Sequence, residues 1–223
     1  MSGMLHIVAT PIGNLEDLTL RALRILKEAD VIIAEDTRVS SKLLTHYDID
    51  THILSYHQHS SEEKKYEILK LLLDGNNLAL ITDAGTPGIS DPGNELIDFI
   101  FRNSPDVKII PIPGASAITS ALSVSGFKTE KFVFIGFLPK KKRTKLFNWL
   151  KSGEITFAFY ESPKRIVKSL SILEENFGSD TRIFVARELT KMFEMLYRGT
   201  IEEVKEMIKE GVKGEIVVVV EGK

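Results

Sequence analysis

The chain has 223 residues, of which 43% are hydrophobic and 27% charged, and it contains no cysteine. The length fits one compact body or two of about 110 residues each, and the near-average composition argues against a disordered, repetitive or membrane-spanning protein, so we expect a cytoplasmic location. Disulfides, thiolate metal ligands and thiol nucleophiles are excluded, and because the formal net charge is only −2, an RNA partner would need a local basic patch.

Short apolar segments in the first half, each followed by turn residues, predict buried strands. They span residues 5–9, 31–34, 78–82 and 107–111. Asn14, with Asp17 three residues later, predicts the start of a helix that has one apolar face. Ser60 with Glu63 predicts a second helix, and residues 115–124 a third. Strands that alternate with helices indicate a mostly parallel sheet.

The second half repeats this alternation, with strands predicted over residues 131–138, 155–160, 182–186 and 215–220. A small-residue turn at residues 125–127 separates the two series of elements. We therefore predict an N-terminal α/β domain over residues 1–125 and a C-terminal α/β domain over residues 126–223. The cleft between two such domains is the default position for a ligand.

One loop is unusually rich in glycine and proline. Residues 83–93 read DAGTPGISDPG and directly follow a predicted strand. Such a loop lets the backbone approach a ligand, although a purely structural turn explains the composition equally well. The sequence has neither a G-x-G-x-x-G fingerprint nor a P-loop, which argues against ordinary NAD or ATP binding.

Charged residues gather at other predicted strand ends. Residues 35–38 (EDTR) and 187–191 (RELTK) are either solvated turns or walls of a binding site. The densest basic run is either an exposed helix start or a clamp for RNA phosphates. It comprises Lys140, Lys141, Lys142, Arg143 and Lys145. His57 and His59 are too weak a pattern to indicate a metal site, so we expect no metal.

Seven segments together resemble the ribosomal RNA small subunit methyltransferase I family, a branch of the tetrapyrrole methylases. They read LHIVATPIGNLEDLTLRAL, VIIAEDTR, ITDAGTPGISDPG, IPGASAITSAL, FIGFLPKKK, FYESPKR and ARELTK. The resemblance implies two α/β domains, a mostly parallel sheet in the first and a mixed sheet in the second, with S-adenosylmethionine bound in the cleft between them. It also implies a homodimer.

The resemblance also implies positions that bind the cofactor. In the first cofactor loop it is Ile12; in the second they are Asp83, Ala84, Gly85, Thr86 and Ile89; in the third they are Ser116 and Ala117. Tyr160 and Leu189 match positions that close over the cofactor from the second domain. Thr86 stands where the wider family usually has aspartate, so Asp83 is expected to substitute for that carboxylate.

The implied reaction is transfer of a methyl group to the 2′-hydroxyl of a cytidine ribose in small-subunit ribosomal RNA. We expect Asp36 or Glu188 to accept the proton of that hydroxyl. Arg38, Arg187 and Lys191 are expected to hold phosphates beside the splayed nucleotide, together with the basic run. Many members of this branch carry a further C-terminal segment, whereas this chain stops at Lys223, so the basic run is expected to matter more.

Two other functions remain open from the sequence alone. The same cofactor loops would serve a methyltransferase that acts on a tetrapyrrole or another small substrate. A ribosome-assembly factor without catalytic activity could retain the fold as a scaffold. Salt-sensitive RNA binding would argue against the first alternative, and binding of the methyl donor would argue against the second.

Overall fold

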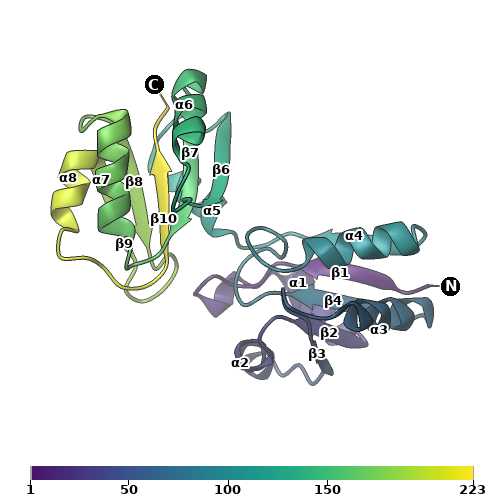
Figure 1. The fold of residues 1–223 in the computed structure, drawn as a ribbon. Helices are drawn as coiled ribbons and strands as arrows, with labels where there is room; N and C mark the ends of the chain where they lie inside the picture. Colours follow the sequence, from purple (N-terminus) through teal and green to yellow (C-terminus); the bar gives the residue numbers. More distant parts are fainter. Residues whose placement is uncertain (1, 223) are drawn as a thin grey trace. The chain divides into compact units, whose positions relative to one another are not determined.

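A computed structural model describes residues 2–222, which divide between Ser116 and Ala117 into two units (Figure 1). Each unit contains one five-stranded sheet with helices against it. The predicted fold class is therefore confirmed. Among the described residues, no helix is both long enough and apolar enough to span a membrane.

The first sheet is entirely parallel and has the strand order β3-β2-β4-β1-β5. Its strands are β1 Met4–Val8, β2 Val31–Ala34, β3 Ile53–Ser55, β4 Leu78–Ile81 and β5 Lys108–Ile112. Every residue of β4 is buried, as expected for a central parallel strand that is covered on both faces. The four predicted strands are confirmed to within one residue at each end, and only β3 was not expected.

Helices cover both faces of this sheet. They are α1 Leu20–Glu28, α2 Thr37–His46, α3 Glu62–Leu73 and α4 Asn94–Asn103. Buried side chains of α1 and α2 form one apolar cluster with the strands, and those of α3 and α4 form another. The helices thereby leave the carboxyl ends of the parallel strands to the loops, where ligands bind in such sheets.

The helix expected after Asn14 is interrupted. A 3-10 helix, η1, covers Leu15–Asp17 and is capped by the Asn14 side chain, which accepts from the Glu16 amide at 3.1 Å. Leu18 then adopts extended backbone, and the Thr19 hydroxyl caps α1 by accepting from the Ala22 amide at 3.1 Å. The apolar spacing is helical throughout, but a second capping residue restarts the helix.

The second sheet is mixed and has the order β6-β7-β10-β8-β9. Its strands are β6 Phe132–Phe137, β7 Thr156–Glu161, β8 Arg182–Arg187, β9 Met195–Thr200 and β10 Ile216–Val220. Only β6 and β7 pair in parallel; the other neighbours are antiparallel. Edge strand β9 was not expected, because four of its six residues are a glycine, a threonine, an arginine and a tyrosine in no simple alternation.

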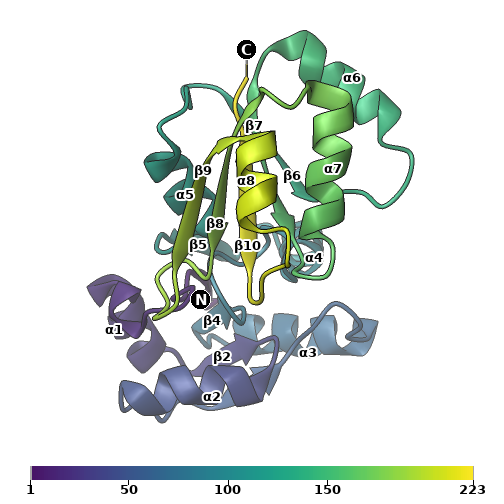
Figure 2. The ribbon, with the colours of Figure 1, turned by 90° about the vertical axis from the view of Figure 1, so that its left-hand side faces the viewer.

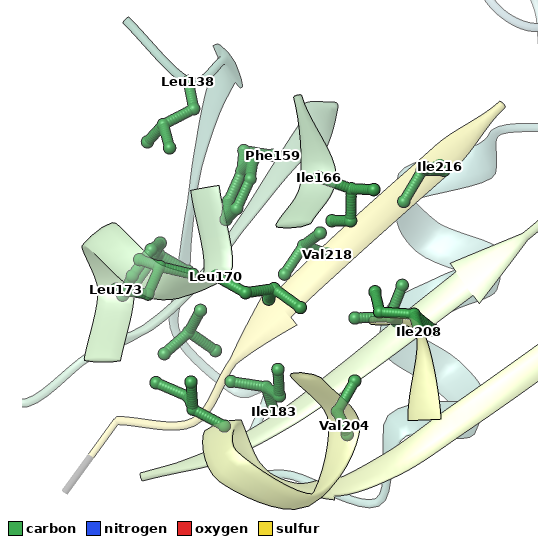
Figure 3. Close-up of a cluster of buried hydrophobic side chains, with 14 of the residues drawn as sticks. Leu138, Phe159, Ile166, Leu170, Leu173, Ile183, Val204, Ile208, Ile216 and Val218 are labelled. Carbon is green, nitrogen blue, oxygen red and sulfur yellow. The ribbon is translucent and has the colours of Figure 1, made fainter. Parts of the chain in front are cut away.

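Three helices pack on one face of this sheet: α6 Thr144–Gly153, α7 Ile166–Phe177 and α8 Ile201–Met207. Figure 2 shows α7 and α8 over that face. The core between these helices and the sheet is aliphatic with a few aromatic rings, and Figure 3 labels ten of its residues. They are Leu138, Phe159, Ile166, Leu170, Leu173, Ile183, Val204, Ile208, Ile216 and Val218.

The opposite face is covered by α5 Ala117–Ser125, and this places the division of the chain earlier than the predicted residue 125. Ile118, Ala121 and Leu122 of α5 are buried in a cluster with Phe184 and Val219 of the second sheet. The turn that follows α5 is real, since Gly126 has φ +75°. Helix α5 nevertheless belongs to the second unit, because its apolar face needs that sheet for burial.

Candidate active site

Backbone hydrogen bonds join two loops at the carboxyl edge of the first sheet. The Thr10 amide donates to the Gly85 carbonyl at 2.9 Å, and the Gly85 amide donates to the Thr10 carbonyl at 3.0 Å. The Thr10 hydroxyl also donates to the Thr82 carbonyl at 3.2 Å. The loops that follow β1 and β4 are therefore fixed against each other.

The predicted cofactor positions of the first unit meet at this junction. A Cβ on Gly85 would lie 3.4 Å from Cγ2 of Ile12 and 3.8 Å from the Ala115 carbonyl oxygen. The Thr86 hydroxyl donates to that same carbonyl at 3.3 Å. Ile12 and Gly85 are buried, whereas Ile89 is 47% exposed. The structure thus brings together the three loops in which cofactor contacts were predicted, although they are far apart in the sequence.

Glycines let backbone segments pack closely together at the carboxyl edge of the first sheet. Gly85 and Gly88 have φ of +80° and +82°, values that favour glycine. A Cβ on Gly114 would lie 3.0 Å from that of Ala9, so the loop after β5 runs directly against the end of β1. Thr82, whose carbonyl accepts from the Thr10 hydroxyl, has a buried hydroxyl of its own with no hydrogen-bond partner among the described residues.

Asp36 and Arg38 form a pair at the end of β2. Asp36 caps α2 by accepting from the Arg38 amide at 2.9 Å, and its carboxylate binds the Arg38 guanidinium at 2.7 and 3.1 Å. These bonds hold the pKa of Asp36 at about 2. Asp83 accepts from the Asp36 amide at 3.2 Å and so links the β2 and β4 loops. A carboxylate with so low a pKa is a weak proton acceptor.

Glu35 has the opposite electrostatics and was not singled out from the sequence as a proton acceptor. Its side chain is half-buried at the end of β2, and burial followed by the negative charge of Asp83 raises its pKa. Its neighbour Asp36 raises the pKa further, while His57 lowers it. A carboxylate with a raised pKa is better matched to proton transfer near neutrality. The sequence signal was the pair of adjacent carboxylates after an apolar strand, but burial distinguishes the two.

Three predicted cofactor residues lie on the α5 face of the second sheet. Ala117, Tyr160 and Leu189 are all partly buried against the apolar cluster of that face. The ring of Tyr160 packs edge-on to Phe134, with 5.1 Å between centroids. These residues therefore share one apolar surface within the second unit.

The Glu188 carboxylate accepts hydrogen bonds from its own unit. Glu188 has φ +51°, and its carboxylate accepts from the Glu215 amide at 2.8 Å and from Lys191 Nζ at 3.1 Å. The bond from Glu215 is the main reason that the pKa of Glu188 is lowered. Lys191 also binds the Glu215 carboxylate at 3.0 Å. Arg187 donates to the carbonyls of Lys213 and Phe193 at 2.5 and 3.2 Å.

The basic run follows β6 and continues into the first turn of α6. Four of its five cations are exposed, and Arg143 is partly buried. Within residues 2–222, none of the five forms an ion pair with a carboxylate at 4.0 Å or less. In contrast, Arg38, Arg187 and Lys191 all have partners within the chain. Across the described residues, no group of three or more His, Asp and Glu side chains could hold a metal ion.

Comparison with known proteins gives the family. The model for the tetrapyrrole (corrin/porphyrin) methylases matches residues 4–205. Two relatives named ribosomal RNA small subunit methyltransferase I come from Halalkalibacterium halodurans and Thermotoga maritima, at 47% and 45% identity. Each alignment covers 99% of this chain, and they cover 76% and 99% of the respective relatives.

Solved structures share the fold at low sequence identity. The methyltransferase CobJ has a TM-score of 0.73 at 19% identity, with 99% of this chain and 95% of that chain covered. A diphthine synthase has a TM-score of 0.75 at 15% identity, with 98% and 90% covered. From the family model and the relatives together, the chain belongs to the tetrapyrrole methylases and, within them, to the ribosomal RNA small subunit methyltransferase I family.

Proposed function

We propose that this chain uses S-adenosylmethionine to methylate the 2′-hydroxyl of a cytidine ribose in 16S ribosomal RNA. The observation that carries the proposal is the similarity, over 99% of the chain, to proteins named ribosomal RNA small subunit methyltransferase I. The junction of loops in the first unit supports it, since the backbone there is open to close approach by a ligand.

The residues at that junction fit the cofactor. S-adenosylmethionine supplies a methyl group on a cationic sulfur, and the thioether that departs is neutral and needs no acid. Ile12, Ala84, Gly85, Thr86 and Ile89 would hold it in the first unit, with Asp83 and Ser116 beside them. Ala117, Tyr160 and Leu189 are the residues that we assign to it in the second unit. The positive φ of Gly85 and its packing on Ile12 support this assignment.

A hydroxyl group is a weak nucleophile near neutral pH, so a base within hydrogen-bond reach would assist its attack. Asp36 and Glu188 remain candidates, but each already accepts hydrogen bonds within the chain and has a lowered pKa. We place Glu35 ahead of both, because its pKa is raised. The order can be tested by comparing pH-rate profiles of Glu35→Gln, Asp36→Asn and Glu188→Gln.

RNA would be bound mainly through phosphate contacts of the basic run. Its five cations form no ion pair within the described chain, so RNA binding would not first require breaking one. They are Lys140, Lys141, Lys142, Arg143 and Lys145. Arg38, Arg187 and Lys191 already bind partners within the chain, so we assign them a smaller share of the phosphate contacts. The target nucleotide must leave its stack for a ribose hydroxyl to be reached.

We further propose that the protein is a homodimer and works in the cytoplasm, where its ribosomal substrate is made. Exposed apolar side chains at and before β9 offer a surface for a second copy: Met192, Phe193, Met195 and Leu196. Such a group on an edge strand is typical of an interface. Sedimentation equilibrium would give the mass, and Leu196→Glu should shift a dimer toward monomer.

The function is tested by incubating the protein with labelled S-adenosylmethionine and small ribosomal subunits that lack the modification. Label in the 16S RNA supports the proposal. Donor binding without label in RNA, but with label in an added tetrapyrrole, would favour the small-substrate enzyme. RNA binding without any donor binding would leave only the assembly factor.

A further inference from the structure

Strand β6 contains a bulge just before the basic run. Phe134 lies opposite Ala158 of β7, and Phe137 lies opposite Tyr160, so three steps along β6 match two steps along β7. Gly136, inside this interval, has φ +66°, which favours glycine and accommodates the extra residue.

The bulge decides on which face the Phe137 side chain lies. Side chains alternate between the faces of a strand, so without the extra residue position 136 would lie opposite Tyr160, and Phe137 would turn to the other face. With it, Phe137 joins Phe134 and Tyr160 on one face. The Phe137 and Tyr160 ring centroids are 5.7 Å apart. Phe137 remains 54% exposed, so one side of the ring is open to solvent.

The chain is anchored immediately after this ring. Arg165 donates from Nη2 to the Leu138 carbonyl at 2.5 Å, and its Nε lies 3.3 Å from Glu161 Oε1. The Glu161 side chain is fully buried and also accepts from the Ser162 amide at 2.8 Å and the Ser169 hydroxyl at 2.5 Å. A satisfied buried network of this kind rigidifies its surroundings. The exit of β6 is thus held in place, while the basic run beyond it is exposed.

An exposed aromatic ring on an edge strand is common and needs no function by itself. Here the bulge sets the face on which the ring lies, and a second aromatic ring packs against it. The next residue, Leu138, is anchored through its carbonyl by Arg165, and cations without carboxylate partners in the described chain follow. Aromatic rings beside positive charge are how proteins hold unstacked nucleotides: the ring stacks on the base and the cations bind the backbone.

We propose that Phe137 is a stacking platform for an unstacked base of the RNA substrate, with the Gly136 bulge and Arg165 as its positioning elements. This inference rests on the proposed function, because it takes RNA as the substrate. It assigns one base of that RNA to a surface of the second unit. The charge of the neighbouring run favours a nucleic acid over an uncharged partner.

The test compares Phe137→Ala with Phe137→Trp and with Phe132→Ala as a matched control. Phe132 is an exposed phenylalanine at the other end of the same strand. Phe137→Ala should raise KM for the ribosomal subunit about ten-fold or more while leaving the affinity for S-adenosylmethionine unchanged. Phe137→Trp should retain the wild-type KM, and so should Phe132→Ala. Equal effects of both alanine variants, or loss of cofactor affinity in Phe137→Ala alone, would overturn the proposal.

A second readout separates this inference from the proposed function. In a Trp149→Phe background, which removes the single native tryptophan, the fluorescence of Phe137→Trp should be quenched by a single-stranded RNA oligonucleotide. Quenching by RNA in a protein that methylates no subunit would remove the proposed function and retain the stacking site. Methylation by the wild type, with no quenching and no change of KM in Phe137→Ala, would remove the stacking site alone.

Discussion

Thr10 and Gly85 exchange both backbone hydrogen bonds, amide to carbonyl, at 2.9 and 3.0 Å. This exchange is an isolated antiparallel bridge at the edge of a parallel sheet, and it fixes the glycine-rich loop against the loop after β1. The geometry requires φ +80° at Gly85, with Ile12 directly against the position of a Cβ. The candidate cofactor site of the first unit depends on this contact.

Gly85→Ala should therefore weaken S-adenosylmethionine binding by more than ten-fold. The new methyl group would only touch Ile12, at 3.4 Å, but φ +80° is strained for any residue with a Cβ, so the loop must shift to relieve that strain. Isothermal titration calorimetry would measure the affinity. The matched control is Gly126→Ala, because Gly126 also has a positive φ, +75°, but open space where its Cβ would be. A similar loss of affinity in both variants would mean that a general loss of stability, rather than the shape of the Gly85 loop, is responsible.

Glu35→Gln should raise the thermal stability of the protein above the folded pKa of Glu35. Burial and the charge of Asp83 raise that pKa, so ionised Glu35 lowers the stability of the folded state. Below about pH 4 the carboxyl is protonated in both folded and unfolded chains, and the difference should vanish there. Thermal unfolding from pH 4 to pH 8 would show the two curves diverging as pH rises. A stability difference that is independent of pH would contradict the assignment.

Changing four lysines of the basic run to glutamine should weaken RNA binding and flatten its salt dependence. The variant carries Lys140, Lys141, Lys142 and Lys145→Gln. On single-stranded RNA the slope of log affinity against log salt should fall by about 0.7 for each phosphate contact that is lost. A control with four exposed lysines changed elsewhere, Lys27, Lys70, Lys108 and Lys128→Gln, should keep most of the slope. Equal slopes for the two variants would show that the run is only a solvated surface.

Glu161→Ala should lower the free energy of unfolding by about 3 kcal/mol, because it leaves Arg165 and the Ser169 hydroxyl without a buried acceptor. Urea denaturation measures this value. Glu221→Ala removes the partner of Arg182 in an ion pair that is partly exposed, and it should cost less than about 1 kcal/mol. Comparable losses in the two variants would argue that the Glu161 network contributes no more than a surface pair.

Helices and strands were predictable from the sequence where an apolar pattern marks their buried residues. The strand over residues 31–34 has the predicted bounds, because four apolar residues between turn signals can only be a buried segment. Strand β9 was missed, since an edge strand exposes one face and shows no apolar pattern. Helix α5 was predicted but assigned to the wrong side of the boundary, because sequence does not show against which sheet an apolar helix packs.

The candidate site was predictable in its loops and less so in its chemistry. The glycine-rich segment and the TPIGN segment could be aligned with the family, and the structure brings them together. The chemistry of the carboxylates depends on partners that are distant in sequence. Glu188 is bound to the Glu215 amide, and the pKa of Glu35 is raised partly by Asp83. Neither contact has a signature in a local motif.

Ribose methylation is tested most directly by locating the methyl group in the product. Small ribosomal subunits that lack the modification are labelled by the protein from S-adenosylmethionine, and the 16S RNA is then hydrolysed with alkali. Because alkaline cleavage needs a free 2′-hydroxyl, a ribose-methylated cytidine should survive as a labelled, uncleaved dinucleotide, and Gly85→Arg should give no label. Label that is released with a mononucleotide would place the methyl group on a base and would contradict 2′-O-methylation.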